Sequence, residues 1–403
     1  MRGKTVLLVG AGRHQRRAIQ RAHDLGVRVV AVDRNPDAPG LAVADAGEVV
    51  DFSDVERVVD VGRRHAVDGV LTISADRAVP VVAAVAEELG LPGIGTKVAH
   101  AMTHKVAMRR RLGEAGVPQP RFAAAHDLRD ARAAAARVGY PAVLKPADSG
   151  GQRGVFKVDS EDDLDAHLHA ALAESGTGEA IVERFHEGLE LNGLVVSRDG
   201  KGMVLTLSDR LRPPGIGFGV GWIHVYPTTI FGDVLDEAAR VALHAVHALG
   251  LGDGIAFPQL LVEDGRSLVV EVAARVPGGQ MADLARHAVG VDLIEVALLQ
   301  ALGEPVPDEL VVPRFQQPLA IRFLTAEPGP LPPGKVRRVG RLDRMLGAPG
   351  VVQADVFLQE GETIRPVRLD GDRRGYVIAV ADTNLEALER AEAAARLLDV
   401  VVE

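Results

Sequence analysis

Residues 141–157, PAVLKPADSGGQRGVFK, decide how this chain is interpreted. A short apolar strand that carries Lys145 leads into a glycine-rich loop at 148–154, and a second strand returns directly at 155–158. Three glycines allow backbone amides to turn toward one point, and a concavity of exposed N–H groups binds phosphate. Lys145 and Lys157 add positive charge on the two strands. The pattern predicts a phosphate-binding hairpin, although the stretch alone is also compatible with an ordinary hairpin with a flexible tip.

Two later segments favour the phosphate-binding interpretation. A short apolar strand ends near Glu183, and the turn after it leads to Glu190 at the start of the next strand. Residues 254–275 then predict two strands around the turn EDGR, and Glu271 and Arg275 lie at the end of the second strand. A carboxylate at such a position can hold a hard cation, and a guanidinium can clamp an anionic oxygen. These segments therefore predict a magnesium–phosphate site.

Together these motifs resemble the ATP-grasp superfamily, and the resemblance covers nearly the whole chain. The order matches, from Lys105 through Lys145 and the glycine-rich loop to the Glu183–Glu190 segment and the strand that carries Glu271. Within the superfamily the chain looks most like carboxylate–amine ligases of the amino-acid ligase kind, and its amino-terminal domain is also similar to purine-biosynthetic members. The resemblance implies an ATP- and Mg²⁺-dependent ligase. Such an enzyme activates an amino acid or similar small acid as an acyl phosphate and joins it to an amine, giving an amide, ADP and phosphate.

The resemblance and the alternation of predicted elements indicate an α/β fold with three parts. The first is a doubly wound parallel-sheet domain, the second an ATP-grasp domain with its lid, and the third a small α/β domain with strands at 319–324, 353–358 and 375–380. A single helix is expected over Ala99–Ala115, and an extended glycine-rich stretch over Pro213–Gly221. The predicted boundaries are 1–96, 97–317 (with the lid at about 118–186) and 318–403.

The amino-terminal part alternates three strands with three helices, the pattern of a doubly wound sheet. Gly10–Gly12 forms the first turn and Asp33 ends the second strand, so a dinucleotide-binding dehydrogenase is an alternative. Against it, Gln15 replaces the third glycine of the fingerprint, and the bulky Arg13 and His14 fill the turn. We therefore expect this domain to bind substrate and no dinucleotide, as the resemblance implies.

Composition excludes several classes of protein. A chain of 403 residues is long enough for two or three domains. Its net charge of −9 argues against a nucleic-acid partner. With no cysteine there is neither a disulfide nor a thiolate zinc site. No apolar run reaches membrane-spanning length, so we expect a cytoplasmic enzyme with small-molecule carboxylate and amine substrates. A homodimer is left open.

The resemblance also implies how the nucleotide is bound. Lys105 and Lys145 would hold the α- and β-phosphates, while the loop amides would close over the β- and γ-phosphates. Glu183 and the backbone after it would take the adenine, and Glu190 the ribose hydroxyls. The predicted ATP-binding residues are Lys105, Lys145, Ser149, Gly150, Gly151, Gly154, Glu183, Arg184, Phe185, His186 and Glu190.

Metal binding and catalysis are predicted at the end of the Glu271 strand. Glu271 would bind magnesium, and Arg275 would stabilise the acyl phosphate and the tetrahedral intermediate. The superfamily's other metal-binding acid falls at Gln259, a neutral oxygen donor, and its usual asparagine two residues after Glu271 is Ala273. Magnesium accepts few protein ligands and keeps several waters, so activity is still expected, while the number of metal ions is open.

The identity of the substrates is less determined. Candidate pocket residues suit a carboxylate-bearing or zwitterionic small molecule: Arg210, His224, Arg275 and Arg322. The segment Arg373–Tyr376 falls where purine-type members bind a ribosyl phosphate, although a solvated basic turn would have the same sequence. Three alternatives to the amino-acid ligase stay open: a purine-type carboxylase or formyl-transfer enzyme, the dehydrogenase, and an inactive nucleotide-binding regulator, which the substitution at Gln259 favours.

Overall fold

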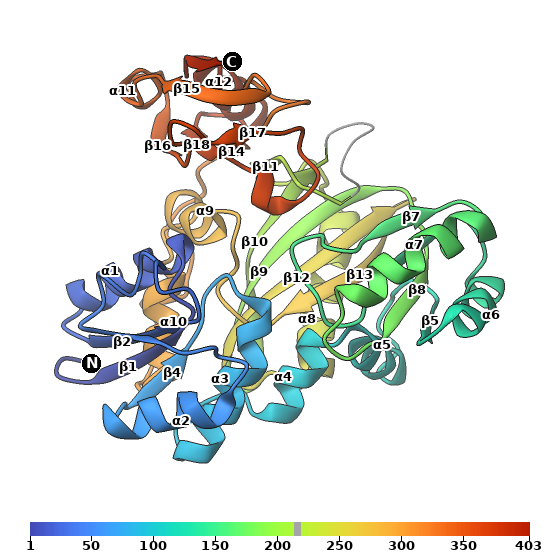
Figure 1. The fold of residues 1–403 in the computed structure, drawn as a ribbon, viewed down its shortest axis with the longest axis horizontal. Helices are drawn as coiled ribbons and strands as arrows, with labels where there is room; N and C mark the ends of the chain where they lie inside the picture. Colours follow the sequence, from blue (N-terminus) through green and yellow to red (C-terminus); the bar gives the residue numbers. More distant parts are fainter. Residues whose placement is uncertain (213–218) are drawn as a thin grey trace.

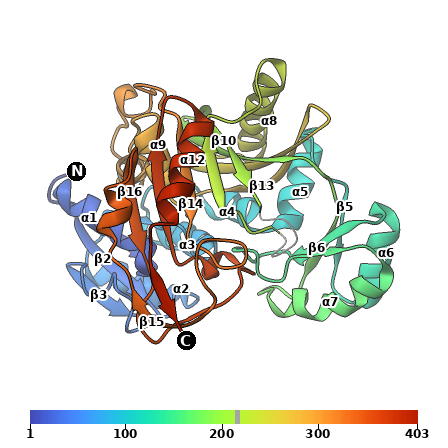
Figure 2. The same ribbon diagram turned by 90° about the horizontal axis from the view of Figure 1, so that it is seen from above.

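A computed structural model of the protein describes residues 1–212 and 219–403. The amino-terminal domain lies at one end of the molecule, the lid at the other, and a long twisted sheet connects them (Figure 1). Seen from above, the carboxy-terminal elements cover the side of the molecule that holds the amino-terminal domain, away from the lid (Figure 2). None of the helices in the described ranges is long and apolar enough to cross a membrane.

The amino-terminal domain is a four-stranded parallel sheet in the order β3-β2-β1-β4. Its strands carry a nearly continuous buried run of valine and leucine, as expected for a parallel sheet covered on both faces. Its elements are β1 (Thr5–Val9), α1 (Arg16–Asp24), β2 (Arg28–Asp33), β3 (Ala46–Val49), α2 (Val55–Arg64), β4 (Gly69–Leu71) and α3 (Val79–Leu89). The sequence predicted every element of this domain except the edge strand β3.

The lid is a four-stranded antiparallel sheet in the order β5-β8-β6-β7, with α6 and α7 packed on one another and on the sheet. Alanines fill its small core, which suits a chain with only 3% aromatic residues. Asp127 and Ser160 cap the two helices through their side chains. The elements are β5 (Phe122–Ala125), α6 (Leu128–Val138), β6 (Ala142–Pro146), β7 (Phe156–Val158), α7 (Glu161–Ala173) and β8 (Ala180–Arg184).

The helix predicted over Ala99–Ala115 is wrong, because the structure has two helices there. Helix α4 (Thr96–Thr103) ends before His104, whose backbone is extended, and α5 (Lys105–Glu114) begins after it. The Lys105 amide donates to the Ala147 carbonyl at 2.6 Å instead of continuing a helix. The break therefore fixes the start of α5, and with it Lys105, against the glycine-rich loop.

The central sheet has eight strands in the order β13-β12-β9-β10-β11-β14-β18-β16, and all neighbours are antiparallel. Helix α8 (Asp233–Leu249) packs against β10, β12 and β13. The strands are β9 (Leu189–Arg198), β10 (Lys201–Leu211), β11 (Ile223–Tyr226), β12 (Gly254–Glu263), β13 (Arg266–Ala273), β14 (Leu319–Phe323), β16 (Val351–Val356) and β18 (Gly375–Val380). The sheet therefore continues past the predicted domain boundary at 317, and three strands of the last segment extend it.

The remaining carboxy-terminal elements form a second layer. Helix α12 (Asn384–Ala395) packs against β14 and β18, and a three-stranded sheet has the order β17-β15-β19. Its strands and the short α11 were not predicted: β15 (Gly334–Val339), α11 (Asp343–Leu346), β17 (Thr363–Ile364) and β19 (Val400–Val402). Two helices, α9 (Met281–Ala288) and α10 (Leu293–Ala301), connect the central sheet to the amino-terminal domain. Of the predicted stretch Pro213–Gly221, residues 213–218 lie outside the described residues.

Candidate active site

A cavity of about 910 Å³, including the part open to solvent, lies between the lid and the central sheet. Segments from 105 to 271 meet there, although they are far apart in the chain. Residues of three kinds predicted from the sequence line it together: nucleotide-binding, metal-binding and substrate-binding. These are Lys105, Lys145, Ser149, Gly150, Gly151, Glu183, Arg184, Phe185, His186, Glu190, Arg210, Gln259 and Glu271.

The glycine-rich loop forms one wall of this cavity. Gly151 has φ +71°, a conformation that favours glycine. The side-chain oxygen of Ser149 is buried and has no hydrogen-bond partner among the described residues. Lys105 donates through Nζ to the Ser149 carbonyl at 2.7 Å, so the ammonium lies beneath the loop. A buried hydroxyl without a partner beside a lysine is the environment of a bound anion. Gly154 lies outside the cavity lining, against Pro146 and Glu174.

Lys145 belongs to a buried ion-pair cluster. Its Nζ lies 2.7 Å from Glu183 Oε2, and Arg109 Nε lies 2.7 Å from Glu183 Oε1. Arg109 also donates to the Val269 and Val270 carbonyls of β13, which ties the cluster to the central sheet. Although burial opposes the ionised form, Arg109 and Lys145 lower the pKa of Glu183 to about 2. The carboxylate predicted to face an adenine therefore also holds Lys145, and sequence reasoning missed Arg109.

The segment after β8 forms another part of the cavity wall. The Phe185 amide donates to the Pro141 carbonyl, and His186 Nδ1 lies 2.7 Å from Glu263 Oε2. Glu190 forms ion pairs with Arg210 and with Arg212, the second at 3.0 Å. Arg184, Phe185 and His186 thus line the cavity together. Their nucleotide contacts stay predictions, as does the contact of Glu190 with ribose.

Glu271 and Gln259 lie opposite one another on β13 and β12, and both line the cavity. Glu271 Oε1 lies 3.3 Å from Lys105 Nζ, while Gln259 Nε2 donates to Asn192 Oδ1 at 3.2 Å. A carboxylate, an amide and space for phosphate and water suit Mg²⁺, which needs few protein ligands. Within the described ranges no group of three or more His, Cys, Asp or Glu side chains could hold a metal ion by itself.

Arg275 lies just beyond the cavity and is fixed by Asp76 of the amino-terminal domain. Its Nε and Nη2 donate to the two Asp76 oxygens at 2.8 and 2.9 Å. The remaining nitrogen, Nη1, is buried and has no partner in the part of the chain that the structure describes. Asp76 itself approaches the loop, since a Cβ at Gly150 would lie 2.8 Å from its Oδ2. An oriented guanidinium with one unsatisfied donor can receive an anionic oxygen.

The other substrate candidates have different surroundings. His224 is buried and its Nδ1 lies 3.1 Å from Asn192 Nδ2, between the cavity and the loop that follows Arg275. Arg322 lines neither of the two cavities. Its Nε lies 2.7 Å from Glu392 of α12, and its guanidinium stacks on Trp222. Arg322 therefore joins the central sheet to the carboxy-terminal layer, away from the predicted pocket.

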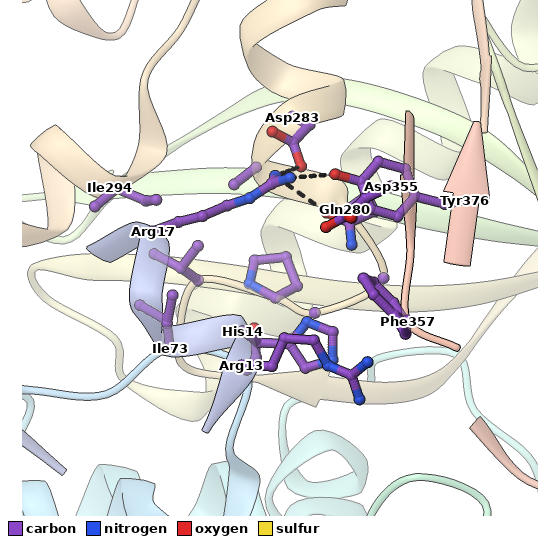
Figure 3. A pocket seen from close by; sticks show the side chains of 16 residues that line it. Arg13, His14, Arg17, Ile73, Gln280, Asp283, Ile294, Asp355, Phe357 and Tyr376 are labelled. Carbon is purple, nitrogen blue, oxygen red and sulfur yellow. Dashed lines mark hydrogen bonds and ion pairs between the residues drawn. The ribbon is translucent and has the colours of Figure 1, made fainter. Parts of the chain in front are cut away.

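A second cavity of about 500 Å³ lies between the amino-terminal domain, the loop before α9 and the carboxy-terminal segment. Figure 3 shows Arg17 reaching Asp283 and Tyr376, while Arg13 lies beside Phe357 at 4.0 Å from the ring centroid. Burial and the neighbouring Arg13, Arg17 and Arg373 lower the pKa of His14. The sequence singled out the bulky residues after the first turn but gave no sign that they meet the carboxy-terminal segment.

Arg373 lies beside Gly279 of the second cavity. Its side chain is 12% exposed, its guanidinium stacks on Phe323 at 4.1 Å, and it donates to the Gly221 carbonyl. Burial and then Arg210 lower its pKa. Burial together with Arg373 and Arg210 also lowers the pKa of His224 well below its ordinary value. The basic turn of the sequence is thus part of a largely buried cationic cluster, in which Arg210 and Arg373 carry the charge and His224 is neutral, and which an anion would stabilise.

Ligand closure gives a first prediction. Asp148 accepts from the Gly176 and Thr177 amides, so the base of the glycine-rich loop is held while the cavity-lining part remains free to order over a ligand. Saturation with a non-hydrolysable ATP analogue at 100 times Kd should slow hydrogen exchange at 148–157 by up to about a hundredfold. Helix α12 is the internal control. Unchanged exchange at 148–157 on saturation would rule the closure out.

Comparisons with known proteins identify related domains along the chain. Three domain families match: the ATP-grasp N-terminal domain over residues 19–93, the carbamoyl-phosphate synthase L chain ATP-binding domain over 104–309, and the L-amino acid ligase C-terminal domain 2 over 322–403. A formate-dependent phosphoribosylglycinamide formyltransferase of Ignicoccus hospitalis is 33% identical over 98% of this chain and 96% of its own.

Solved structures with the same fold include the L-amino acid ligase of Bacillus licheniformis, with TM-score 0.86, 22% identity and full coverage of both chains. The N5-carboxyaminoimidazole ribonucleotide synthetase of Thermotoga maritima has TM-score 0.76 and 22% identity, over 99% of this chain and 100% of its own. The full-length relative favours the purine-type alternative over the amino-acid ligase as the more specific interpretation. The matching domains, the relative and the site together establish that this chain belongs to the ATP-grasp superfamily of ADP-forming, C–N bond-forming ligases.

Proposed function

We propose that this ATP-dependent ligase joins a small carboxylate to the amine of an acceptor that carries a phosphorylated ribose, the class named for its full-length relative. The buried cationic cluster carries the proposal. Arg210, His224 and Arg373 lie together between the two cavities, and His14 belongs to the same electrostatic neighbourhood. Arg210 pairs with Glu190 and Arg373 with Asp370, but the two guanidinium groups are largely covered and repel one another, so a bound dianion such as phosphate would stabilise them.

The nucleotide would occupy the cavity between the lid and the sheet. Lys105, Lys145 and the loop amides around Ser149 would bind phosphate oxygens, and the unsatisfied Ser149 hydroxyl would find its partner there. Mg²⁺, when bound at Glu271, would neutralise charge on those oxygens. Most of the rate enhancement would come from positioning and electrostatics.

The proposed reaction has two steps. A carboxylate oxygen attacks the γ-phosphorus of ATP, and the bond to ADP breaks to leave an acyl phosphate. The acceptor amine then attacks the acyl carbon, and phosphate and a proton leave as the amide forms. Arg275 Nη1 would bind the acyl phosphate, because the bidentate pair with Asp76 aims this free donor.

A second candidate is an amino-acid ligase, which joins two amino acids. The match of residues 322–403 to the L-amino acid ligase C-terminal domain 2 favours it. Both candidates share the nucleotide site and differ in the acceptor. An amino acid has no dianionic group, so it would leave the cationic cluster less fully compensated.

Turnover with a defined set of substrates tests the proposal. Purified enzyme with ATP and magnesium should release phosphate with formate or another small acid plus phosphoribosylglycinamide. Replacement of Arg373 by alanine should raise the acceptor KM by at least about 30-fold, equivalent to 2 kcal/mol, because its contact is desolvated. The KM for ATP should stay unchanged. The matched control is the exposed Arg365→Ala. Phosphate release with pairs of amino acids, and none with the ribosyl phosphate, would contradict the proposal.

A further inference from the structure

Asn192 lies between a residue of the nucleotide cavity and a residue of the cationic cluster. Its side chain is fully buried on β9. Asn192 Oδ1 accepts from Gln259 Nε2 at 3.2 Å, and its Nδ2 lies 3.1 Å from His224 Nδ1. The three side chains project from β12, β9 and β11 of the central sheet, with β10 between the last two. They form a hydrogen-bonded chain that spans the space between the two cavities.

The donor and acceptor atoms of the three side chains determine the direction of each hydrogen bond between them. The Gln259 amide donates to Asn192 Oδ1, which leaves the Asn192 NH₂ facing the imidazole. A donor facing Nδ1 requires that Nδ1 accept, so in the neutral ring the proton is on Nε2. A carboxylate at position 259 could only accept. Asn192 would then turn its NH₂ toward position 259 and its oxygen toward His224, which would require the proton on Nδ1.

The Nε2 atom of His224 faces the loop that lines the second cavity. A Cβ at Gly279, where φ is +64°, would lie 3.4 Å from His224 Nε2 and 3.8 Å from Arg373 Nη1. The glycine thus leaves space beside two donors. Around the imidazole are Arg210 from β10 and Arg373 from the turn before β18, and both favour the neutral ring. A neutral His224 can therefore present an N–H at this space.

The same amide leaves the nucleotide cavity with fewer metal ligands. Glu271 is the acid toward the open end of the β12–β13 hairpin, and the position opposite it is Gln259. Gln259 Nε2 donates to Asn192 Oδ1, so only the uncharged Oε1 of this amide is available to a cation. A neutral amide also contributes less than a carboxylate to a divalent cation site.

We propose that Gln259 acts as a positioning residue: through Asn192 it fixes His224 as an Nε2–H donor beside Gly279, and the nucleotide site binds one divalent cation tightly, at Glu271. The proposal deepens the proposed function and rests on it only for the nucleotide–metal complex. Neither measurement below involves the acceptor or turnover. A failure of this proposal can therefore be distinguished from a wrong choice of acceptor in the proposed function.

The first readout is the tautomer of His224, measured by ¹⁵N NMR of the imidazole in the full-length protein at neutral pH. The wild type should show the Nε2–H form, with His224→Gln used to assign the signal. Gln259→Glu should convert it to the Nδ1–H form. An Nδ1–H or fully protonated imidazole in the wild type would overturn the proposal, whatever the behaviour of the variant.

The second readout is metal stoichiometry, measured by Mn²⁺ titration with electron paramagnetic resonance in the presence of a non-hydrolysable ATP analogue. The wild type should bind one Mn²⁺ per nucleotide in the site, and Gln259→Glu should bind a second at least about tenfold more tightly than the wild type does. Gln359→Glu, the same change at an exposed position, should bind one. Two tightly bound Mn²⁺ ions in the wild type would overturn the proposal.

Discussion

Glu271→Ala should abolish ATP turnover, with a loss of at least about 10²-fold, while the protein stays folded. Glu271 lines the cavity between the lid and the central sheet, 3.3 Å from Lys105 Nζ, and its side chain is 27% exposed. A partly exposed carboxylate contributes little to stability, so its removal should act on phosphate and metal binding. Phosphate release at saturating magnesium and ATP measures the effect.

The control for Glu271→Ala removes the same chemical group elsewhere. Glu389 lies on the exposed face of α12, and Glu389→Ala should keep wild-type turnover. Thermal unfolding of both variants separates a lost ligand from a lost fold. Turnover within threefold of the wild type in a folded Glu271→Ala protein would remove Glu271 from the catalytic site.

Glu183→Gln should lower the free energy of unfolding by about 3–5 kcal/mol, the effect of leaving buried charges without their partner. The change removes the anion between Arg109 and Lys145, and the side chains of all three residues are at most 6% exposed. Urea denaturation measures the loss. Asp165→Asn, which breaks the exposed pair of Asp165 with Arg132, is the matched control and should change stability little.

The same cluster predicts a pH dependence. The pKa of Glu183 is about 2 in the folded protein against an ordinary 4.5, so ionised Glu183 stabilises the fold fully above pH 4.5. That contribution should be lost as pH falls from about 4.5 through about 2. The Glu183→Gln variant should lack this part of the acid dependence. An equal acid dependence in both proteins would show that Glu183 is not held by its two cations.

Much of the lining of the cavity between the lid and the central sheet could be predicted from the sequence because its parts are local. The glycine-rich loop, the strand before it and the Glu271 strand each carry their own pattern, and the cavity brings them together. The interpretation of Glu183 was incomplete, because its partner Arg109 lies 74 residues away and no local pattern signals the pair. Arg322 was misplaced for the same reason, since its partner Glu392 lies on a helix of the last segment.

Elements with weak local signals were also missed. Strand β3, AGEV, is an edge strand with half of its residues exposed, so it shows no buried run. The break at His104 depends on a hydrogen bond from Lys105 to Ala147, which the helical pattern of 99–115 does not reveal. The second cavity is assembled from three distant segments, and only the packed fold shows that Arg17 and Tyr376 meet.

Product analysis of a single turnover tests most directly that this chain is an acyl-phosphate-forming ligase. With ATP, magnesium, a small carboxylate and hydroxylamine in place of the acceptor, the enzyme should release ADP and phosphate and yield a hydroxamate in equal amounts. Omission of the carboxylate should remove all three products. Formation of AMP and pyrophosphate would instead mean adenylation of the carboxylate, and the mechanism built on Lys145, Glu271 and Arg275 would be wrong.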